Sequence, residues 1–547
     1  HVTVASSTTL TIEPGVTVKF DGGKALVIEG TLVARGTSTS TITFTSSALS
    51  PAAGDWGYIE FKTGSTGTTF DGDGDYVSGS IFEHCVVEYG GSYAESFAFL
   101  DVVLGAPYIN SCTFTNNEGG NVGGVVGAYR WTGSSYDPVK ITNSTFTQND
   151  AVAIRFAINA TITGNTITYN KLGIEFDGGA ITITDNVITH NTGNSIFDAG
   201  GIWGNIDNGS VVTISGNQIS DNGSSGVYIS MQSFSTYTVT ISGNTIVRNS
   251  GGSLGGGIRG PGNLGNSSPG LTLNITNNYI ADNAAGSGGG IYISYAQSWN
   301  NPNYNISYNR IHGNTATDGS ALYMTGGNKT FEYNSITGGT GTSLIFTGGG
   351  TTIRYNNFVH KSETYLIYEG SWSNTTADLE NNWWGTTDTT NLDALIYDWN
   401  DNPNTAQVDY TPFLTAPDTT APPSPPQNVA AQTGPTSIAL SWSANPESDI
   451  AGYKVHYDTD AAGYPYTSSV DVGNVTSSTL TGLSTATTYY TAVSAYDIDG
   501  NESWVSSDMS ATPQSVPTTL AFSTQPSGAT AGDSFTAQAV IVIQDLE

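Results

Sequence analysis

Basic residues are scarce in this chain of 547 residues: 15 Lys and Arg stand against 46 Asp and Glu, which gives a formal net charge of −31. Such a charge repels polyanions, so we expect no binding to nucleic acid or to an anionic membrane surface. Cations and neutral glycans are better candidates as partners. The sequence also lacks any uninterrupted apolar run of roughly 18 residues, so we expect no membrane span.

One short phrase recurs from Cys85 to Asn382: Asn, any residue, Ile, two residues, Asn. Its copies, clear at first and weaker in the last three, begin at Asn165, Asn186, Asn217, Asn244, Asn278, Asn309, Asn334, Asn357 and Asn382. Alignment of the flanking residues extends the same position back to Ser144, Cys112 and Cys85. A repeat of 21 to 34 residues that varies only by insertions predicts a solenoid, in which each coil buries its apolar side chains against its neighbours.

Within each coil the apolar residues alternate, as at Val212 and Ile214, which is the period of a strand. Equivalent strands of successive coils then lie parallel, about 4.8 Å apart, so twelve stacked positions predict a shaft of about 50 Å. An Asn at the same corner of every coil can donate to one neighbouring coil and accept from the other. We therefore expect an asparagine ladder that satisfies buried turn groups.

With this repeat, residues 1–415 resemble the right-handed parallel β-helix proteins that carry pectate-lyase-like repeats. Two early segments, residues 10–16 and 30–36, are similar to the first coils of secreted bacterial members. A late segment, residues 380–386, is similar to their C-terminal cap. The resemblance implies an N-terminal cap and first coils in 1–62, then a β-helix with its cap in 63–415, where Trp383 and Trp384 cover the last coil. It also implies export to a bacterial cell surface, and a chain that starts at His1 without Met or signal peptide looks like a mature or trimmed product.

The C-terminal part changes in character. Residues 416–426 are rich in Pro, Thr and Ser and predict a semi-rigid linker. Residues 427–513 resemble a fibronectin type III module, with Trp442 on an early strand and Leu483 preceding Tyr489 by the interval of a tyrosine corner. Residues 514–547 resemble the opening of a bacterial surface Ig-like repeat. Their two strand-like runs either belong to a sandwich completed in a longer chain or pair with the sheet edge of a neighbouring subunit, a route to filaments or a lattice.

The predicted fold class is therefore all-β: a right-handed parallel β-helix solenoid plus C-terminal β-sandwich modules. The middle coils carry the candidate surface chemistry. On the strand after the second Asn, the residue following the buried one points outward. This column contains Arg155, Glu175, Trp203, Tyr228, Arg259, Tyr292, Tyr323, Ile345 and Ile367.

Trp203, Tyr228, Arg259, Tyr292 and Tyr323 are the glycan-binding candidates, because aromatic faces can take the C–H sides of sugar rings. The partner would be a polysaccharide or a cell-surface glycan. Insertions in the same coils add four aromatic residues to a predicted groove wall: Phe234, Tyr237, Tyr295 and Trp299. The alternative is that the aromatic residues only stabilise one another across strands in a structural shaft.

The resemblance also implies a possible enzymatic function, since the enzymes of this family cleave or epimerise polysaccharides. Their lyase, polygalacturonase and epimerase motifs are absent, so we assign no catalytic residue. The best acid pair is Glu175 and Asp177, two apart on one strand and about 7 Å apart, a separation that suits an inverting glycosidase. Arg155 lies one coil away, however, and a surface ion pair with Glu175 is the simpler account.

Two smaller features remain. Asp71, Asp73 and Asp75 alternate with glycines and suit calcium, although the EF-hand pattern fails at Tyr76 and Phe82; the alternative is a solvated acidic turn. Calcium is the one cofactor considered. The two cysteines, Cys85 and Cys112, fall in the same slot of adjacent coils, where they form either a disulfide or two buried thiols in ladder positions.

Overall fold

The computed structural model describes all of the chain except residues 92–97, 104, 120–123, 129–137, 194–198, 208, 232–235, 262–269, 295–301, 348–350, 360–365, 370–375, 515–518, 529, 535–536, 538 and 545–547. It divides into two compact units, His1–Ala421 and Pro422–Glu547, and each is described by itself.

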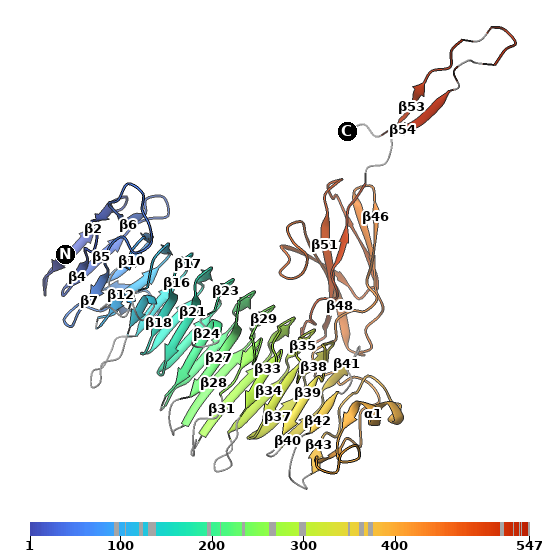
Figure 1. Ribbon diagram of the computed structural model, residues 1–547, viewed down its shortest axis with the longest axis horizontal. Coiled ribbons are helices and arrows are strands. Elements are labelled where there is room, and N and C mark those ends of the chain that lie inside the picture. Colours follow the sequence, from blue (N-terminus) through green and yellow to red (C-terminus); the bar gives the residue numbers. More distant parts are fainter. Residues whose placement is uncertain are drawn as a thin grey trace. The chain divides into compact units, whose positions relative to one another are not determined.

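The first unit is a parallel β-helix in which one chain winds through three long parallel sheets, here named sheets A, B and C (Figure 1). Up to β41 (Asn357–Val359), each coil adds one strand to each sheet in turn, as β18 (Val152–Phe156), β19 (Ala160–Thr163) and β20 (Thr166–Thr168) do; among the described residues, the last two coils add strands to sheets A and B alone. The strands of the next coil pair with these in parallel register. The parallel solenoid predicted from the repeat is thus confirmed.

Sheet A positions the candidate site and contains fifteen strands. They are β1 (Val2–Val4), β4 (Leu26–Ile28), β7 (Ile59–Phe61), β12 (Ala98–Val102), β15 (Gly124–Ala128), β18, β21 (Leu172–Asp177), β24 (Ala199–Ile206), β27 (Ser225–Met231), β30 (Ile258–Arg259), β33 (Ile291–Ser294), β36 (Leu322–Thr325), β39 (Leu344–Thr347), β42 (Ile367–Glu369) and β44 (Ile396–Tyr397). Because β7 pairs with β12 in the same register as with β4, the sheet runs without a break past residue 62, and the first residues already form regular coils.

Apolar side chains fill the inside of the coils from Val4 to Val408 in one continuous cluster. The short strands of sheet C each turn their middle residue inward. Ile167, Ile188 and Ile219 stack in this way in successive coils and are fully buried. The alternating pattern of the sequence therefore corresponds to one inward row and one outward row on each sheet.

Two asparagine ladders hold the corners on either side of sheet C. The one before it passes through the twelve predicted slots: Cys85, Cys112, Ser144, Asn165, Asn186, Asn217, Asn244, Asn278, Asn309, Asn334, Asn356 and Asn382. The sequence alignment was wrong at one of them, because Asn356 and not Asn357 occupies the slot. Asn357 instead exchanges two hydrogen bonds with the backbone of Asp418, at 2.8 and 2.9 Å.

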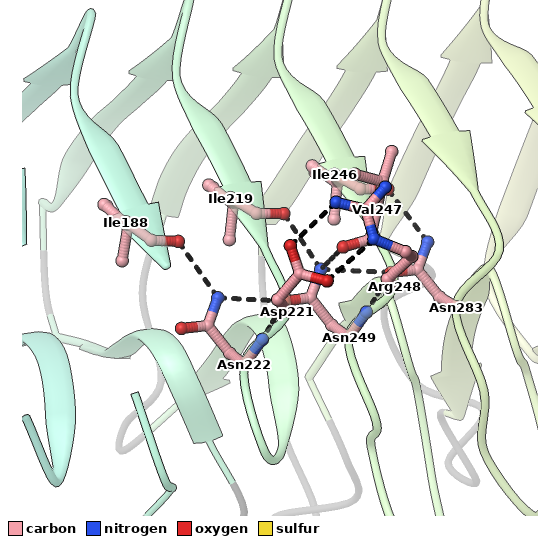
Figure 2. Close-up of polar contacts among 9 residues, drawn as sticks. All are labelled: Ile188, Ile219, Asp221, Asn222, Ile246, Val247, Arg248, Asn249 and Asn283. Atoms are coloured by element: carbon pink, nitrogen blue, oxygen red, sulfur yellow. Dashed lines mark hydrogen bonds and ion pairs between the residues drawn. The ribbon is translucent and has the colours of Figure 1, made fainter. Parts of the chain in front are cut away.

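The second ladder, from Asn117 to Asn314, shows the geometry (Figure 2). The amide of Asn249 donates to the carbonyl of Ile219 at 2.9 Å and to Oδ1 of Asn283 at 3.0 Å. Its own Oδ1 accepts from the backbone N–H of Asn222 at 3.2 Å and from that residue's amide at 2.9 Å. Each rung thus bonds the coils on both sides, as predicted.

The residue before a ladder position has a left-handed backbone, with φ of 57° at Asp185 and 53° at Arg248. This conformation turns the chain sharply, so that the next side chain points inward. Glycine, Asn and Asp fill many of these corners, but three consecutive coils place tyrosine there, at Tyr308, Tyr333 and Tyr355, with φ between 55° and 60°. Their rings stack at centroid distances of 5.3 and 5.2 Å.

The last coils end in a cap that contains α1 (Thr389–Leu395) and β45 (Gln407–Asp409). Asp388 caps the helix by accepting from the N–H of Thr390 at 3.0 Å. Trp384 is fully buried and stacks on Phe358 at 4.7 Å, as a lid requires. Trp383, the other predicted lid residue, is only half-buried.

Residues 430–511 of the second unit form two antiparallel sheets. One contains β46 (Ala430–Gly434), β47 (Ser437–Ser441) and β50 (Ser477–Thr481); the other contains β49 (Ser468–Gly473), β48 (Ile450–Asp458), β51 (Tyr489–Asp497) and β52 (Met509–Ala511). Trp442 packs against Tyr453, and the hydroxyl of Tyr489 accepts from the N–H of Ser484 at 3.1 Å, which completes the predicted tyrosine corner.

The boundary between the units falls inside the predicted linker, and each side of it is anchored within its own unit. Asp418 bonds Asn357, and the N–H of Ser424 donates to Glu447 at 2.8 Å. Farther on, β53 (Thr519–Thr524) and β54 (Val540–Gln544) form an antiparallel hairpin at the two strand-like runs. That they open an Ig-like repeat stays a prediction. Nowhere in the described ranges is there a helix long and apolar enough to cross a membrane.

Candidate functional site

The predicted outward column of sheet A exists, with each member in register with the next. Its seven polar and aromatic members, here called the outer column, are Arg155, Glu175, Trp203, Tyr228, Arg259, Tyr292 and Tyr323. Ile345 follows them as predicted, but the next member is Tyr368. The prediction of Ile367 was wrong, because this residue pairs with Leu344 on the inward row and is 1% exposed.

The aromatic rings of the outer column contact their neighbours along the shaft. Tyr292 and Tyr323 stack at a centroid distance of 5.1 Å with an interplanar angle of 14°. The guanidinium of Arg259 lies 4.2 Å from the centre of the Tyr228 ring. These are the cross-strand contacts that the structural alternative predicts, and Tyr228, Tyr292 and Tyr323 are half-buried.

Trp203 and Tyr228 also pack on a small apolar cluster formed by Val152, Leu172 and Ala199. All three cluster residues are buried, and both rings are half-buried. The two side chains are therefore held in place by the coils beneath them. A rigid ring that keeps part of its surface exposed loses little conformational entropy when it binds a ligand.

Glu175 lies at the start of this aromatic segment and is only 3% exposed. Its Oε1 accepts from Nε of Arg155 at 2.8 Å, so the predicted ion pair is present, although it is buried and not at the surface. Its Oε2 is buried without a hydrogen-bond partner in the described part of the structure. Burial raises the pKa of Glu175 to about 7, against the lowering effect of Arg155 and with a further increase from Asp177.

Two residues that the sequence did not single out complete the polar end of the column. Asn205 stands in register with Asp177 and donates to its Oδ1 at 3.0 Å. Burial, and then the charge of Asp207, raise the pKa of Asp177. Asp207 packs closely over Gly178, where a Cβ would lie 2.2 Å from its Oδ1 and where a φ of 75° also favours glycine. The register alone would have placed Asn205 beside Asp177.

The predicted groove wall is only partly described. Tyr237 is 1% exposed and belongs to the core row of β28 (Thr236–Ser242), so its assignment to the wall was wrong. The alternation of β28 puts this residue inward. Phe234, Tyr295 and Trp299 lie outside the described residues.

Asp71, Asp73 and Asp75 form the tip of a hairpin between β8 (Thr69–Phe70) and β9 (Tyr76–Ser78). Oδ1 of Asp71 accepts from the backbone N–H of Asp73 at 3.0 Å and of Asp75 at 2.9 Å. This is the geometry of a hydrogen-bonded acidic turn. Across the described ranges, no group of three or more His, Cys, Asp or Glu side chains is placed to hold a metal ion.

Cys85 and Cys112 are both buried free thiols. The N–H of Cys85 donates to Sγ of Cys112 at 3.4 Å, and the N–H of Cys112 donates to Oγ of Ser144 at 3.0 Å. The hydrogen bond with Cys112, together with burial, raises the pKa of Cys85. The geometry is thus that of the second alternative, two thiols in ladder slots.

Comparison with known proteins agrees with this architecture. Residues 123–298 match the family model for a right handed beta helix region, and residues 424–509 match the model for a fibronectin type III domain. A curated relative, the Kelch domain-containing protein SSO1033 of Saccharolobus solfataricus, is 42% identical over 96 residues, which cover 18% of this chain and 12% of that protein. The chain thus spans about an eighth of this relative's length.

Among solved structures, the FN5 domain of Drosophila Lar is 27% identical over 17% of this chain and 99% of its own, with a TM-score of 0.15. The FN1–FN3 domains of chicken CNTN1 are 24% identical over 17% of this chain and 33% of their own, with a TM-score of 0.16. The chain therefore contains a right-handed parallel β-helix and a fibronectin type III domain, an organisation that fits an extracellular or surface protein.

Proposed function

We propose that this is a secreted bacterial surface protein with a structural and adhesive role, in which the β-helix is a shaft and the outer column contacts a polysaccharide or cell-surface glycan. The supporting observation is the unbroken register of the outer column, which aligns rings and polar groups at the spacing of the coils. A linear polymer laid along the shaft would meet one side chain of the outer column at each coil.

The absence of a recognised catalytic motif from the sequence favours binding over turnover. The ion pair between Arg155 and Glu175 points the same way, since it engages one of the two carboxylates considered for catalysis. The acidic composition favours a neutral or cationic glycan over a uronic acid polymer.

The test is a panel of polysaccharides offered to the full chain, with both binding and product formation measured. We expect binding without turnover, and a loss of at least about tenfold in affinity for Trp203→Ala and Tyr292→Ala, since exposed aromatic anchors dominate such contacts. Tyr169→Ala is the matched control, because Tyr169 is an exposed aromatic residue (57%) at a corner of the coils and not in the outer column. Equal losses in all three variants would refute the assignment of this face.

Assembly is a separate part of the proposal. Negative-stain electron microscopy of the concentrated protein tests assembly. Regular fibres or lattices would make the outer column a packing surface, whereas dispersed rods would leave it free to bind glycan. Fibres that persist in Trp203→Ala and Tyr292→Ala would show that assembly uses another surface.

A polysaccharide-cleaving enzyme is the second candidate, and one observation favours it. Glu175 has a pKa of about 7, which suits a general acid, and Asp177 lies two residues away on the same strand. If the protein is a glycosidase, the panel releases reducing ends, and Glu175→Gln abolishes their release without abolishing binding. No release from any polymer would remove this candidate for the polymers tested.

A further inference from the structure

The junction between Glu175 and Trp203 carries more acceptor groups than the protein itself uses. Glu175 presents a buried Oε2 that no described residue bonds. Asn205 bonds Oδ1 of Asp177, and no residue in the described ranges bonds the second oxygen of this carboxylate. Asp207, in the next coil, adds a third carboxylate close enough to raise the pKa of Asp177. We name Glu175, Asp177 and Asp207 the acidic subsite.

The charges at the acidic subsite are unbalanced. Among the described residues, Arg155 is the cation that acts on Glu175 and Asp177, while Asp207 adds a further negative charge beside Asp177. A buried carboxylate oxygen without a partner is costly, and so is a surplus of negative charge at one place. A bound cation that donates hydrogen bonds would relieve both.

The cation is not expected to be a metal. Calcium requires six to eight converging oxygen ligands, whereas no three acidic side chains converge on one point among the residues that the structure describes. An ammonium group has a different requirement, because it carries three separate donors that can reach acceptors spread over several ångströms. Glu175 and Asp177 lie on one strand and Asp207 on the adjacent coil, which is this kind of spread arrangement.

We infer that the acidic subsite binds a protonated primary amine of the glycan, so that the preferred ligand is a polymer containing amino sugars. Trp203 stands in register with Glu175, so a sugar ring beside Trp203 would direct its amino group toward the carboxylates. The amine enters past Asp177, which is half-buried, toward the more deeply buried Glu175. This inference rests on the proposed glycan contact and specifies its chemistry.

The experiment compares two oligosaccharides of equal length and linkage, a glucosamine oligomer and its N-acetylated counterpart, by titration calorimetry on the full chain at pH 6 in low salt. We expect the amine-bearing oligomer to bind at least about tenfold more tightly, since charge-assisted hydrogen bonds are the strong ones. The preference should shrink by less than about threefold when salt is raised to 0.5 M, because buried and half-buried charges are screened much less than exposed ones.

Asp177→Asn removes one charge, and Glu175→Gln removes a carboxyl group that is mainly protonated at pH 6 until an amine binds. Both substitutions keep the shape of the side chain. Both should reduce the preference for the amine to about threefold or less and leave the affinity for the N-acetylated oligomer unchanged. Asp150→Asn is the control of equal charge change, because Asp150 is an exposed carboxylate that pairs with Lys171. The control should keep the full preference, and all variants are first compared with the parent chain for thermal unfolding.

The outcomes separate the two proposals. Equal affinity for both oligomers, lost together in Trp203→Ala, would overturn the acidic subsite and leave the glycan contact standing. Absence of binding to either oligomer and to the rest of the panel would overturn both. A titration with calcium chloride alone that gives binding, lost in Asp177→Asn, would replace the amine by a metal and also overturn the inference.

Discussion

The amide ladders make a quantitative prediction at Asn249, which is 1% exposed and lies in the middle of the second ladder (Figure 2). Truncation to alanine removes five hydrogen bonds made by its side chain. The side-chain amide of Asn222 still donates to the carbonyl of Ile188. Oδ1 of Asn283 still accepts from the backbone N–H of residue 249. The backbone N–H of Asn222 loses its acceptor and the carbonyl of Ile219 loses a donor.

Leaving a buried polar group without a partner costs about 1–3 kcal/mol. The carbonyl of Ile219 stays in the parallel pairing with the next coil, so one group, the N–H of Asn222, is left unpaired, and the expected loss for Asn249→Ala is about 1–3 kcal/mol. Serine should recover about half of it, because Ser144 already occupies a ladder slot, where its hydroxyl accepts from the N–H of Cys112 at 3.0 Å and donates to the carbonyl of Thr142 at 2.9 Å. The order of stability should therefore be Asn, then Ser, then Ala.

The measurement is guanidinium unfolding of the full chain followed by far-ultraviolet circular dichroism and tryptophan fluorescence. The stability of a solenoid depends on the contacts between neighbouring coils, which the ladder provides. The unfolding transition of the β-helix is therefore the one to compare between variants. Asn328→Ala is the control, because Asn328 is exposed on sheet B and its truncation should change the free energy of unfolding by no more than about 0.5 kcal/mol. A loss in Asn249→Ala as small as that of the control would refute the argument that the ladder satisfies buried groups.

Three further predictions concern other parts of the chain. Trp384→Ala should destabilise the last coils by about 3–5 kcal/mol, since Trp384 is fully buried on Phe358, and limited proteolysis should then begin at the cap. Burial raises the pKa of Glu175 from 4.5 to about 7, so the folded state holds this proton more tightly than the unfolded state. Relative to Glu175→Gln, the parent chain should lose about 3 kcal/mol of stability as the pH rises from about 4.5 through about 7, and unfolding at pH 5 and pH 8 checks this sign. Tyr489→Phe removes the hydroxyl that accepts from the N–H of Ser484 and should lower the stability of the fibronectin type III unit by about 1–3 kcal/mol, measured on its own unfolding transition.

The parts of the fold that could be predicted are those determined by the repeat period of the sequence. The solenoid, the parallel strands, the ladder slots and the outer column all follow from one repeat, because stacking in register brings equivalent residues together whatever the insertions do. The mistakes at Asn357 and Ile367 have the same origin. In both cases the slot belongs to the adjacent residue, Asn356 or Tyr368, and only the ladder bond or the strand register in the structure decides between the two.

The left-handed corners were not predicted, since local propensity gives conflicting signals there. Glycine at 164, 216 and 243 suits a positive φ, whereas tyrosine at 308, 333 and 355 opposes it by about 1–2 kcal/mol each. Stacking between these tyrosines, worth about 0.5–1.5 kcal/mol a pair, offsets part of the strain. Tertiary contacts between coils, which no single coil encodes, therefore decide the conformation.

The deep burial of Glu175 and the approach of Asp207 to Gly178 could not be predicted for a related reason. A repeat specifies which residues face outward, but not what covers them. An outward glutamate was expected at the surface in a simple ion pair, and the same ion pair is present in a site from which solvent is almost excluded. The change in environment, and not a change in partner, raises the pKa of Glu175.

Coil spacing also limits how a solenoid can bind a glycan. Parallel strands lie about 4.8 Å apart, close to the distance at which aromatic rings stack, so rings at equivalent positions in adjacent coils face each other. Tyr292 and Tyr323 do so on the outer column, and the tyrosines at the corners repeat the arrangement on another surface. Long uniform columns of rings therefore cover most of their own faces, and selectivity must come from positions where the column changes its chemistry. On this shaft the change from Glu175 to Trp203 is such a position, which makes the acidic subsite, and not the tyrosine stack, the decisive place to mutate.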